Sequence, residues 1–263
     1  MCGMPDKLAR AESGPRSLFG RLLELDNRII GLFICATAAY DWFIFYQELG
    51  RAGLYYRFGV YALASLSVLS IFFSAVYLTG AGVILLLLKR PVSRYKTAMP
   101  NLVSILAAFA SYLFVWARTG SFMHVNVYFS YLLIVGGSLL MLTSLLVLRR
   151  AFSVTPQARL LVTAGPYALV RHPMYVGSIV VSLGLAFLVD SPQAMGLFLV
   201  CGFLQIWRAL YEERLLERNF TEYAEYKKRV GRFIPRLRLR SAARNLEAAV
   251  ERSTKLPMRH VAP

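Results

Sequence analysis

Residues 128–148 read YFSYLLIVGGSLLMLTSLLVL, and this run of 21 residues contains no charged side chain. An α-helix rises 1.5 Å per residue, so about 20 apolar residues cross the roughly 30 Å of hydrocarbon in a bilayer. No water reaches backbone polar groups at that depth, and a helix satisfies them internally. The stretch therefore predicts a membrane-spanning helix and an all-α membrane fold.

Five other apolar stretches accompany this one, at residues 29–46, 58–88, 102–117, 175–189 and 194–210. The stretch 58–88 exceeds the length of one upright span, so we expect a helix that tilts or protrudes into the cytosol, or a break near Gly80–Gly82. The last two stretches are separated only by residues 190–193, which predicts a tight helical hairpin. We therefore predict an all-α, polytopic membrane helix bundle with five to six apolar segments and a C-terminal helical hairpin.

Composition and charge also favour a membrane protein. Hydrophobic residues make up 57% of the chain and charged residues 17%, whereas soluble domains carry about 25% charge. With six crossings, 27 of the 30 Lys and Arg residues lie on the side of the two termini and 3 on the other. This positive-inside pattern predicts cytosolic termini, and it accounts for the net charge of +16 without a nucleic-acid partner. The membrane is the plasma membrane in a bacterium or the endoplasmic reticulum in a eukaryote.

Cysteine and histidine spacing favours neither a disulfide framework nor a metal site. Cys2, Cys35 and Cys201 show no paired spacing, and the three histidines form no H-x-x-x-H pair. We therefore expect no bound metal. The first 28 residues lack the apolar core of a secretory signal peptide.

Asp41 is the only acidic residue inside the predicted spans. A carboxylate inside a bilayer costs roughly 2.5–3.5 kcal/mol on insertion scales, so such residues often have a function. Asp41 also lies close to Tyr46 at the end of its stretch, where its carboxylate can reach the headgroups. We favour this second, structural interpretation.

Apolar residues recur at steps of three or four after the hairpin, at Leu216, Phe220, Tyr223, Tyr226, Val230 and Phe233. This spacing predicts an amphipathic helix that lies on the cytosolic surface or folds back on the bundle. The chain then divides into a basic arm (1–28), membrane-spanning helices (29–148), a loop with the hairpin and cytosolic helix (149–240), and a basic tail (241–263). A short helix around residues 245–252 is expected in the tail.

Polar and conformationally special residues concentrate in residues 161–177, LVTAGPYALVRHPMYVG. The pair Gly165-Pro166 predicts a turn. Proline is favoured at the first position of a helix, so Pro173 places His172 at the N-cap of the first hairpin helix. Such a helix end offers unpaired N–H groups and favours an anionic ligand.

Residues 207–213, WRALYEE, end the second hairpin helix. Arg208 and Glu212 are four residues apart and share a helix face. Because the hairpin turn is tight, we expect Glu212 to lie near His172. Each residue has a structural explanation, as a helix cap, an interfacial tyrosine or an i,i+4 ion pair. Their convergence with an apolar wall on one side of the membrane favours a ligand pocket.

Three motifs in this region closely resemble the isoprenylcysteine carboxyl methyltransferase family. They are GPY at 165–167, RHPMYVG at 171–177 and EExxL at 212–216, with YxxYKKRV at 223–230 as a C-terminal signature. The related membrane phospholipid N-methyltransferases share much of this pattern. The resemblance covers about residues 156–235. It implies an integral membrane enzyme that uses S-adenosyl-L-methionine, bound at the cytosolic face.

The resemblance also implies roles for individual residues. The residues implied to contact S-adenosyl-L-methionine are Leu161, Val162, Tyr167, His172, Pro173, Tyr175 and Glu212. Arg208 is implied to hold the carboxylate of the methyl acceptor. The acceptor implied is a lipophilic molecule from the bilayer, by family default the carboxylate of an isoprenylcysteine-like substrate.

The side chains available suit this reaction but leave alternatives open. A carboxylate with a pKa of about 4 is ionised at pH 7 and needs no general base, so positioning supplies most of the rate. An amine acceptor must lose a proton, to His172 or Glu212, and a phospholipid N-methyltransferase is therefore an alternative. A transporter or scaffold is a second, although transporters concentrate polar residues at mid-membrane. A membrane reductase with a nicotinamide cofactor is a third, and it would require basic phosphate contacts that no motif here supplies.

Overall fold

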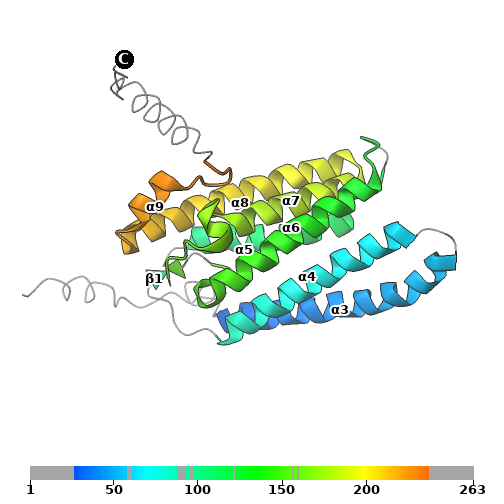
Figure 1. Cartoon of the computed structure of the whole chain (residues 1–263), viewed down its shortest axis with the longest axis horizontal. Coiled ribbons are helices and arrows are strands. Elements are labelled where there is room, and N and C mark those ends of the chain that lie inside the picture. Colours follow the sequence, from blue (N-terminus) through cyan, green and yellow to red (C-terminus); the bar gives the residue numbers. More distant parts are fainter. Residues whose placement is uncertain are drawn as a thin grey trace, which may run out of the picture.

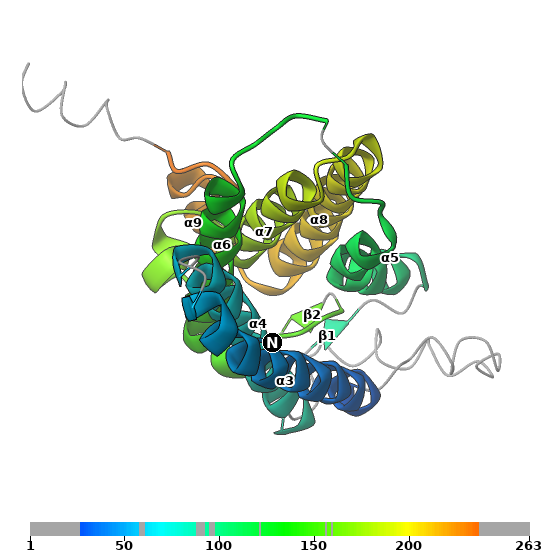
Figure 2. The ribbon, with the colours of Figure 1, turned by 90° about the vertical axis from the view of Figure 1, so that its right-hand side faces the viewer.

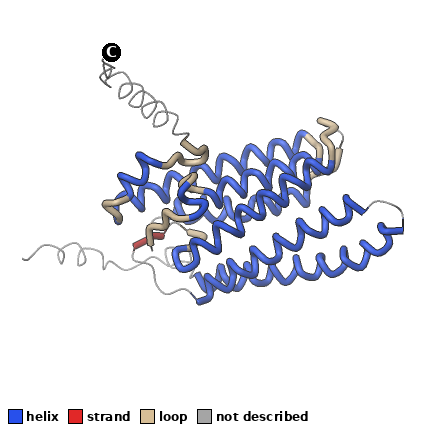
Figure 3. The backbone as a smooth tube through the Cα atoms, in the orientation of Figure 1, coloured by secondary structure: helices blue, strands red, loops and turns tan. Residues whose placement is uncertain are grey.

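The computed structural model describes residues 27–57, 61–87, 93–94, 98–120, 122–155, 157–158 and 160–236. Its longer helices are α3 (Asn27–Arg57), α4 (Tyr61–Leu87), α5 (Ala98–Phe109), α6 (Val127–Leu148), α7 (Pro173–Val189) and α8 (Pro192–Asn219). The short helices are η1 (Ala110–Trp116), η2 (Arg149–Ala151), η3 (Gly165–Ala168) and α9 (Tyr223–Arg229). Two short strands, β1 (Ser93–Arg94) and β2 (Gln157–Ala158), pair antiparallel. Helices dominate the described structure (Figure 3).

Five helical segments are long and apolar enough to cross a membrane. These segments are 28–51, 65–87, 99–116, 127–148 and 192–219, and α7 is a shorter apolar helix. The third segment continues from α5 into η1. The prediction of a polytopic helical membrane protein with five to six apolar segments is therefore confirmed.

The six longer helices form a curved row (Figure 2). Neighbours along the row are α3, α4, α6, α7, α8 and α5, in that order. The two ends of the row approach each other, because the rings of Phe33 on α3 and Phe109 on α5 lie edge to face with centroids 5.1 Å apart. All six helices therefore face a common interior.

Helix α4 runs without a break through Gly80–Gly82, which excludes the break expected as one alternative for this stretch. Gly82 of α4 instead allows close packing against α3. A Cβ atom added to Gly82 would lie 2.5 Å from Cys35 Sγ and 3.2 Å from the Gly31 carbonyl oxygen. Small residues at such contacts let the backbones of membrane helices approach one another.

The predicted hairpin consists of α7 and α8, joined by a turn at Asp190 and Ser191. Asp190 has a left-handed backbone with φ of 50°, and its carboxylate accepts hydrogen bonds from the N–H groups of Met123 (2.6 Å) and His124 (3.0 Å). Ser191 caps α8 by accepting a bond from the Ala194 N–H. The turn is thus fastened to the loop between η1 and α6.

The amphipathic helix predicted after the hairpin is divided in two. Helix α8 continues to Asn219, a turn follows, and α9 begins at Tyr223. The predicted apolar face survives this break, because Tyr223, Tyr226 and Val230 pack with Leu216, Phe220 and Leu161 in one cluster. In Figure 1, α9 lies beside the end of α8. The predicted basic arm, up to residue 26, and the basic tail with its short helix lie outside the described residues.

Candidate functional site

A cavity opens where α6 and α8 end and α7 begins. Figure 1 shows these helix ends at one end of the bundle. The cavity and the open solvent at its mouth together amount to about 460 Å³. We call it the mouth cavity, and its lining residues are Leu148, Ala151, Phe152, Ser153, Thr155, Tyr167, Arg171, His172, Met174, Tyr175, Arg208 and Glu212. Five of the residues singled out from the sequence are among them.

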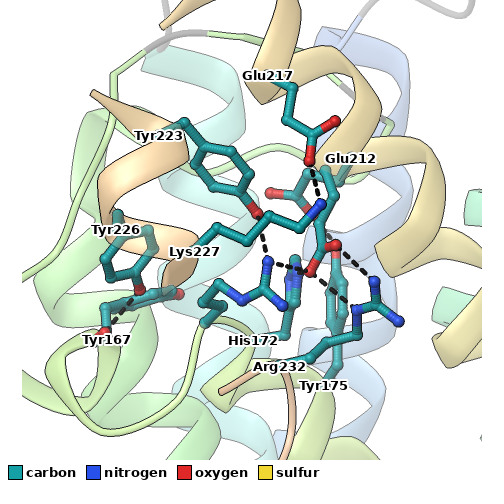
Figure 4. Close-up of polar contacts among 11 residues, drawn as sticks. Tyr167, His172, Tyr175, Glu212, Glu217, Tyr223, Tyr226, Lys227 and Arg232 are labelled. Atoms are coloured by element: carbon teal, nitrogen blue, oxygen red, sulfur yellow. Dashed lines mark hydrogen bonds and ion pairs between the residues drawn. The ribbon is translucent and has the colours of Figure 1, made fainter. Parts of the chain in front are cut away.

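His172, Tyr175 and Glu212 form a chain of contacts from the start of α7 to the end of α8. His172 is the N-cap of α7 and Pro173 its first residue, as predicted. The His172 ring stacks on the Tyr175 ring, with centroids 5.2 Å apart and planes 5° from parallel. The Tyr175 hydroxyl donates a hydrogen bond to the Glu212 carboxylate (Figure 4). The expected proximity of His172 and Glu212 is thus observed.

Arg208 contacts two parts of the protein: the loop that follows α6, and the helix α7. Its Nη2 donates to the carbonyl oxygens of Ser153 (3.2 Å) and Val154 (2.7 Å). The guanidinium carbon lies 4.7 Å from the centroid of the Tyr175 ring, a cation–π distance. These contacts fix a buried positive charge in the wall of the cavity.

Glu213 contacts three basic side chains at this end of the bundle, although the sequence motifs assigned it no role. The residue is 3% exposed, and its carboxylate accepts bonds from Arg232 Nε (2.9 Å) and Nη2 (2.7 Å). His172 Nε2 lies 3.1 Å from Glu213 Oε1, and Arg171 Nη1 lies 3.0 Å from the same oxygen. An ionised carboxylate only accepts hydrogen bonds. Glu213 therefore holds the His172 proton on Nε2 and fixes the direction of the ring.

The segment around α9 holds the loop that carries His172. The N–H groups of Arg171 and His172 donate to the carbonyl oxygens of Gly231 (2.8 Å) and Arg232 (3.1 Å). Hydrogen bonding to Glu213 raises the pKa of the Arg232 guanidinium, which keeps this pair charged.

Tyr226 on α9 makes a second link to the same loop. Its hydroxyl donates to the Tyr167 carbonyl oxygen at 2.6 Å (Figure 4). Burial raises the pKa of the Tyr226 hydroxyl to about 12, while the charge of Arg171 lowers it and that of Glu213 raises it by smaller amounts. The hydroxyl therefore stays protonated and remains a donor at neutral pH.

Three of the residues named from the family resemblance do not line the mouth cavity. Leu161 is half-buried and packs against the cluster of Tyr223, Tyr226 and Val230. Val162 is half-buried beside it in sequence, and Pro173 is buried within α7. A contact between these three residues and a cofactor stays a prediction. Within the described ranges, no three His, Cys, Asp or Glu side chains lie close enough together to hold a metal ion.

A second cavity lies inside the ring of helices. We call it the inner cavity. All six longer helices contribute to its wall, and it shares Phe152, Met174, Tyr175 and Arg208 with the mouth cavity. Tyr175 and Arg208 therefore line both the mouth cavity, at the end of the bundle, and the largely apolar inner cavity within it.

The segment that carries the site is similar to known proteins. Residues 125–223 match the family described as phospholipid methyltransferase. The chain is similar to the cobalt-zinc-cadmium resistance protein CzcN of Cupriavidus metallidurans. The two are 42% identical over 81 residues, and this aligned stretch covers 30% of this chain and 37% of CzcN. The chain is also 40% identical over 81 residues to the nickel-cobalt-cadmium resistance protein NccN of Alcaligenes xylosoxydans xylosoxydans. That alignment covers 30% of this chain and 38% of NccN. The chain thus spans less than two fifths of the length of these relatives.

A structural comparison finds the eukaryotic intramembrane Ras methyltransferase ICMT, an isoprenylcysteine carboxyl methyltransferase. The match has a TM-score of 0.41 and 16% identity, and it covers 83% of this chain and 98% of that one. The family match from residue 125 to residue 223 contains α6, α7, α8 and all the lining residues of the mouth cavity. It agrees with the resemblance indicated by the motifs: residues 125–223 are similar to the phospholipid methyltransferase family.

Proposed function

We propose that this protein is an integral membrane methyltransferase that transfers the methyl group of S-adenosyl-L-methionine to the carboxylate of a lipophilic acceptor. The observation that carries the proposal is the convergence of His172, Tyr175, Arg208 and Glu212 on one cavity, inside the segment that matches a methyltransferase family. The positive-inside charge pattern supports a cytosolic position for this cavity.

The mouth cavity suits the methyl donor. S-adenosyl-L-methionine, when bound, supplies a methyl group on a positively charged sulfur atom. The carboxylate of Glu212 and the aromatic rings of Tyr167 and Tyr175 line the cavity, and both kinds of group attract cations. The positive end of the α7 helix dipole lies beside His172, and it suits a ligand carboxylate. These residues bind and orient, and none needs to react.

Arg208 is suited to hold the acceptor. A guanidinium has N–H groups on three nitrogen atoms, and the hydrogen bonds of Arg208 to other described residues all use Nη2. Its Nε and Nη1 can therefore bind an acceptor carboxylate between the two cavities. The largely apolar wall of the inner cavity suits the apolar part of such an acceptor.

A carboxylate is favoured over an amine because it is already ionised at neutral pH and needs no general base. The buried guanidinium of Arg208 also suits an anionic group better than an ammonium group. The name of the matched family keeps phospholipid N-methylation as the second candidate.

Calorimetry on the protein in lipid nanodiscs tests the donor site. We expect S-adenosyl-L-methionine to bind wild-type protein, and His172→Ala or Glu212→Ala to weaken binding at least tenfold. Glu217→Ala is the matched control, because Glu217 is exposed and pairs with Lys227 outside the cavity. Equal affinity in all four proteins would reject the assignment of the mouth cavity.

Product analysis then separates the two acceptor chemistries. The probes are N-acetyl-S-farnesylcysteine and phosphatidylethanolamine, each supplied with radiolabelled S-adenosyl-L-methionine. A carboxyl methyl ester releases methanol in base, whereas an N-methylated amine does not. We expect base-labile label on the first probe, and label confined to the second would reject the carboxylate in favour of phospholipid N-methylation.

A further inference from the structure

The inner cavity is largely apolar, but one amide in its wall is incompletely hydrogen bonded. Gln205 lies on α8 and is 3% exposed. Its Nε2 donates to the carbonyl oxygen of Ala107 at 3.1 Å and to Ser178 Oγ at 2.8 Å. Within the described part of the chain, its Oε1 has no hydrogen-bond partner.

The orientation of this amide is determined by its neighbours. The Ala107 carbonyl oxygen can only accept a hydrogen bond, so the amide nitrogen must face it. Turning the amide over would set two oxygens against each other. Gln205 Oε1 is therefore held as a buried acceptor, and buried polar atoms in proteins are nearly always paired.

We propose that Gln205 recognises a hydrogen-bond donor on the methyl acceptor, an inference that rests on the proposed function. Gln205 precedes Arg208 by three residues, so the two share a face of α8, and both line the inner cavity. Arg208 would bind the acceptor carboxylate while Gln205 accepts a bond from a nearby N–H or O–H group. The substrate class is then a lipophilic acid that carries an N–H or O–H close to its carboxylate.

The rest of the cavity wall fits the apolar part of such a molecule. Ile34, Leu78 and Ala81 come from α3 and α4, and Phe109 and Met141 come from α5 and α6. The Tyr77 hydroxyl also lines the cavity, and it donates to the Met174 sulfur at 3.7 Å. Gln205 Oε1 is itself covered by the wall, and a small side-chain shift would let it accept a bond from a donor group of an acceptor held by Arg208.

The test compares N-acetyl-S-farnesylcysteine with its N-methylated counterpart, which lacks the amide hydrogen. Binding of each compound to protein in nanodiscs is measured by equilibrium dialysis without methyl donor and corrected with empty nanodiscs. We expect wild-type protein to prefer the N–H compound about tenfold, the ratio given by one recovered hydrogen bond. In Gln205→Met the two affinities should agree within about twofold.

Gln193→Met is the matched control, because Gln193 is exposed in the first turn of the same helix. This variant should keep the tenfold preference for the N–H compound. The proposal is overturned if wild-type protein binds both compounds equally, if it binds neither, or if Gln205→Met retains the preference. The wild-type comparison alone suffices if Gln205→Met does not fold.

Calorimetry with S-adenosyl-L-methionine on the same samples separates this proposal from the proposed function. Donor binding without the amide preference rejects only the role of Gln205. The amide preference without donor binding rejects the methyltransferase and leaves a site for lipophilic acids.

Discussion

The two helical pairs α3–α4 and α7–α8 are held together in different ways. The first relies on close backbone approach at Gly31 and Gly82, with few polar links such as the bond from Ser74 to Asp41 at 2.6 Å. The second ends in a network of buried charge centred on Glu213. The family match includes α7 and α8 but begins after α4. Apolar packing thus suffices to build a membrane helix pair, whereas the site requires specific polar partners.

The largest expected effect comes from removing the centre of the network. In Glu213→Ala, two arginines and His172 lose their shared carboxylate, and breaking a buried ion pair typically costs about 3–5 kcal/mol of folding free energy. We expect a strongly lowered thermal unfolding midpoint in detergent. Glu217→Ala, at an exposed pair, should change the midpoint little. Similar midpoints for the two variants would mean that Glu213 does not hold the network together.

A smaller effect is expected from the glycine within the RHPMYVG motif. A Cβ atom on Gly177 would lie 2.7 Å from both the Gly137 carbonyl oxygen and Met141 Cγ of α6. Overpacking of this kind costs about 1–3 kcal/mol, so Gly177→Ala should destabilise the protein through α6 and α7. The control is Gly196→Ala, where no atom lies within 4 Å. A Gly177→Ala protein as stable as wild type would contradict the close packing.

Tyr226→Phe should cost about 1 kcal/mol, because the Tyr167 carbonyl oxygen loses its hydrogen bond. The pH dependence tests the same contact. The pKa of Tyr226 is about 12 in the folded protein against an ordinary value of 10.0, so the folded state favours the neutral hydroxyl. Its contribution is complete below pH 10 and is lost as the pH rises through 12. Unfolding measured from pH 8 to 12 should lose stability more steeply in wild type than in Tyr226→Phe, and parallel curves would contradict this.

The smallest effect is expected in the α3–α4 pair. Asp41→Asn retains an oxygen that can accept the hydrogen bond from Ser74. We expect a change in unfolding free energy within about 0.5 kcal/mol and unchanged binding of S-adenosyl-L-methionine. A loss of binding would give Asp41 a part in function and would remove the contrast between the two helical pairs.

The fold could be predicted from the sequence because membrane solvation leaves few choices. Uncharged runs of sufficient length become helices, and the bounds expected from 128–148 and 175–189 differ from α6 and α7 by at most two residues. The continuation of α8 to Asn219 was not expected, since the charged residues after Leu210 mark the end of the apolar run and not the end of the helix. Hydropathy reports the surroundings of a helix, whereas its end depends on local backbone geometry.

The candidate site was predictable in part. The tight hairpin correctly indicated that His172 and Glu212 lie close together, because it returns the chain to the same end of the bundle. Glu213 was overlooked although it follows Glu212 directly, because its importance depends on Arg232. Arg232 reaches it only through the pairing of residues 171 and 172 with residues 231 and 232. A contact between such distant segments leaves no periodic signal in the sequence.

The pairing of residues 171 and 172 with residues 231 and 232 also determines when the site can form during synthesis of the protein. A chain is synthesised from its N-terminus, so residues 27–219, with every described segment long enough to span the membrane, are made before Gly231 and Arg232. Until these two residues emerge, the N–H groups of Arg171 and His172 lack their carbonyl partners and Glu213 lacks one of its arginines. The mouth of the bundle is therefore completed only after all these helices have been synthesised.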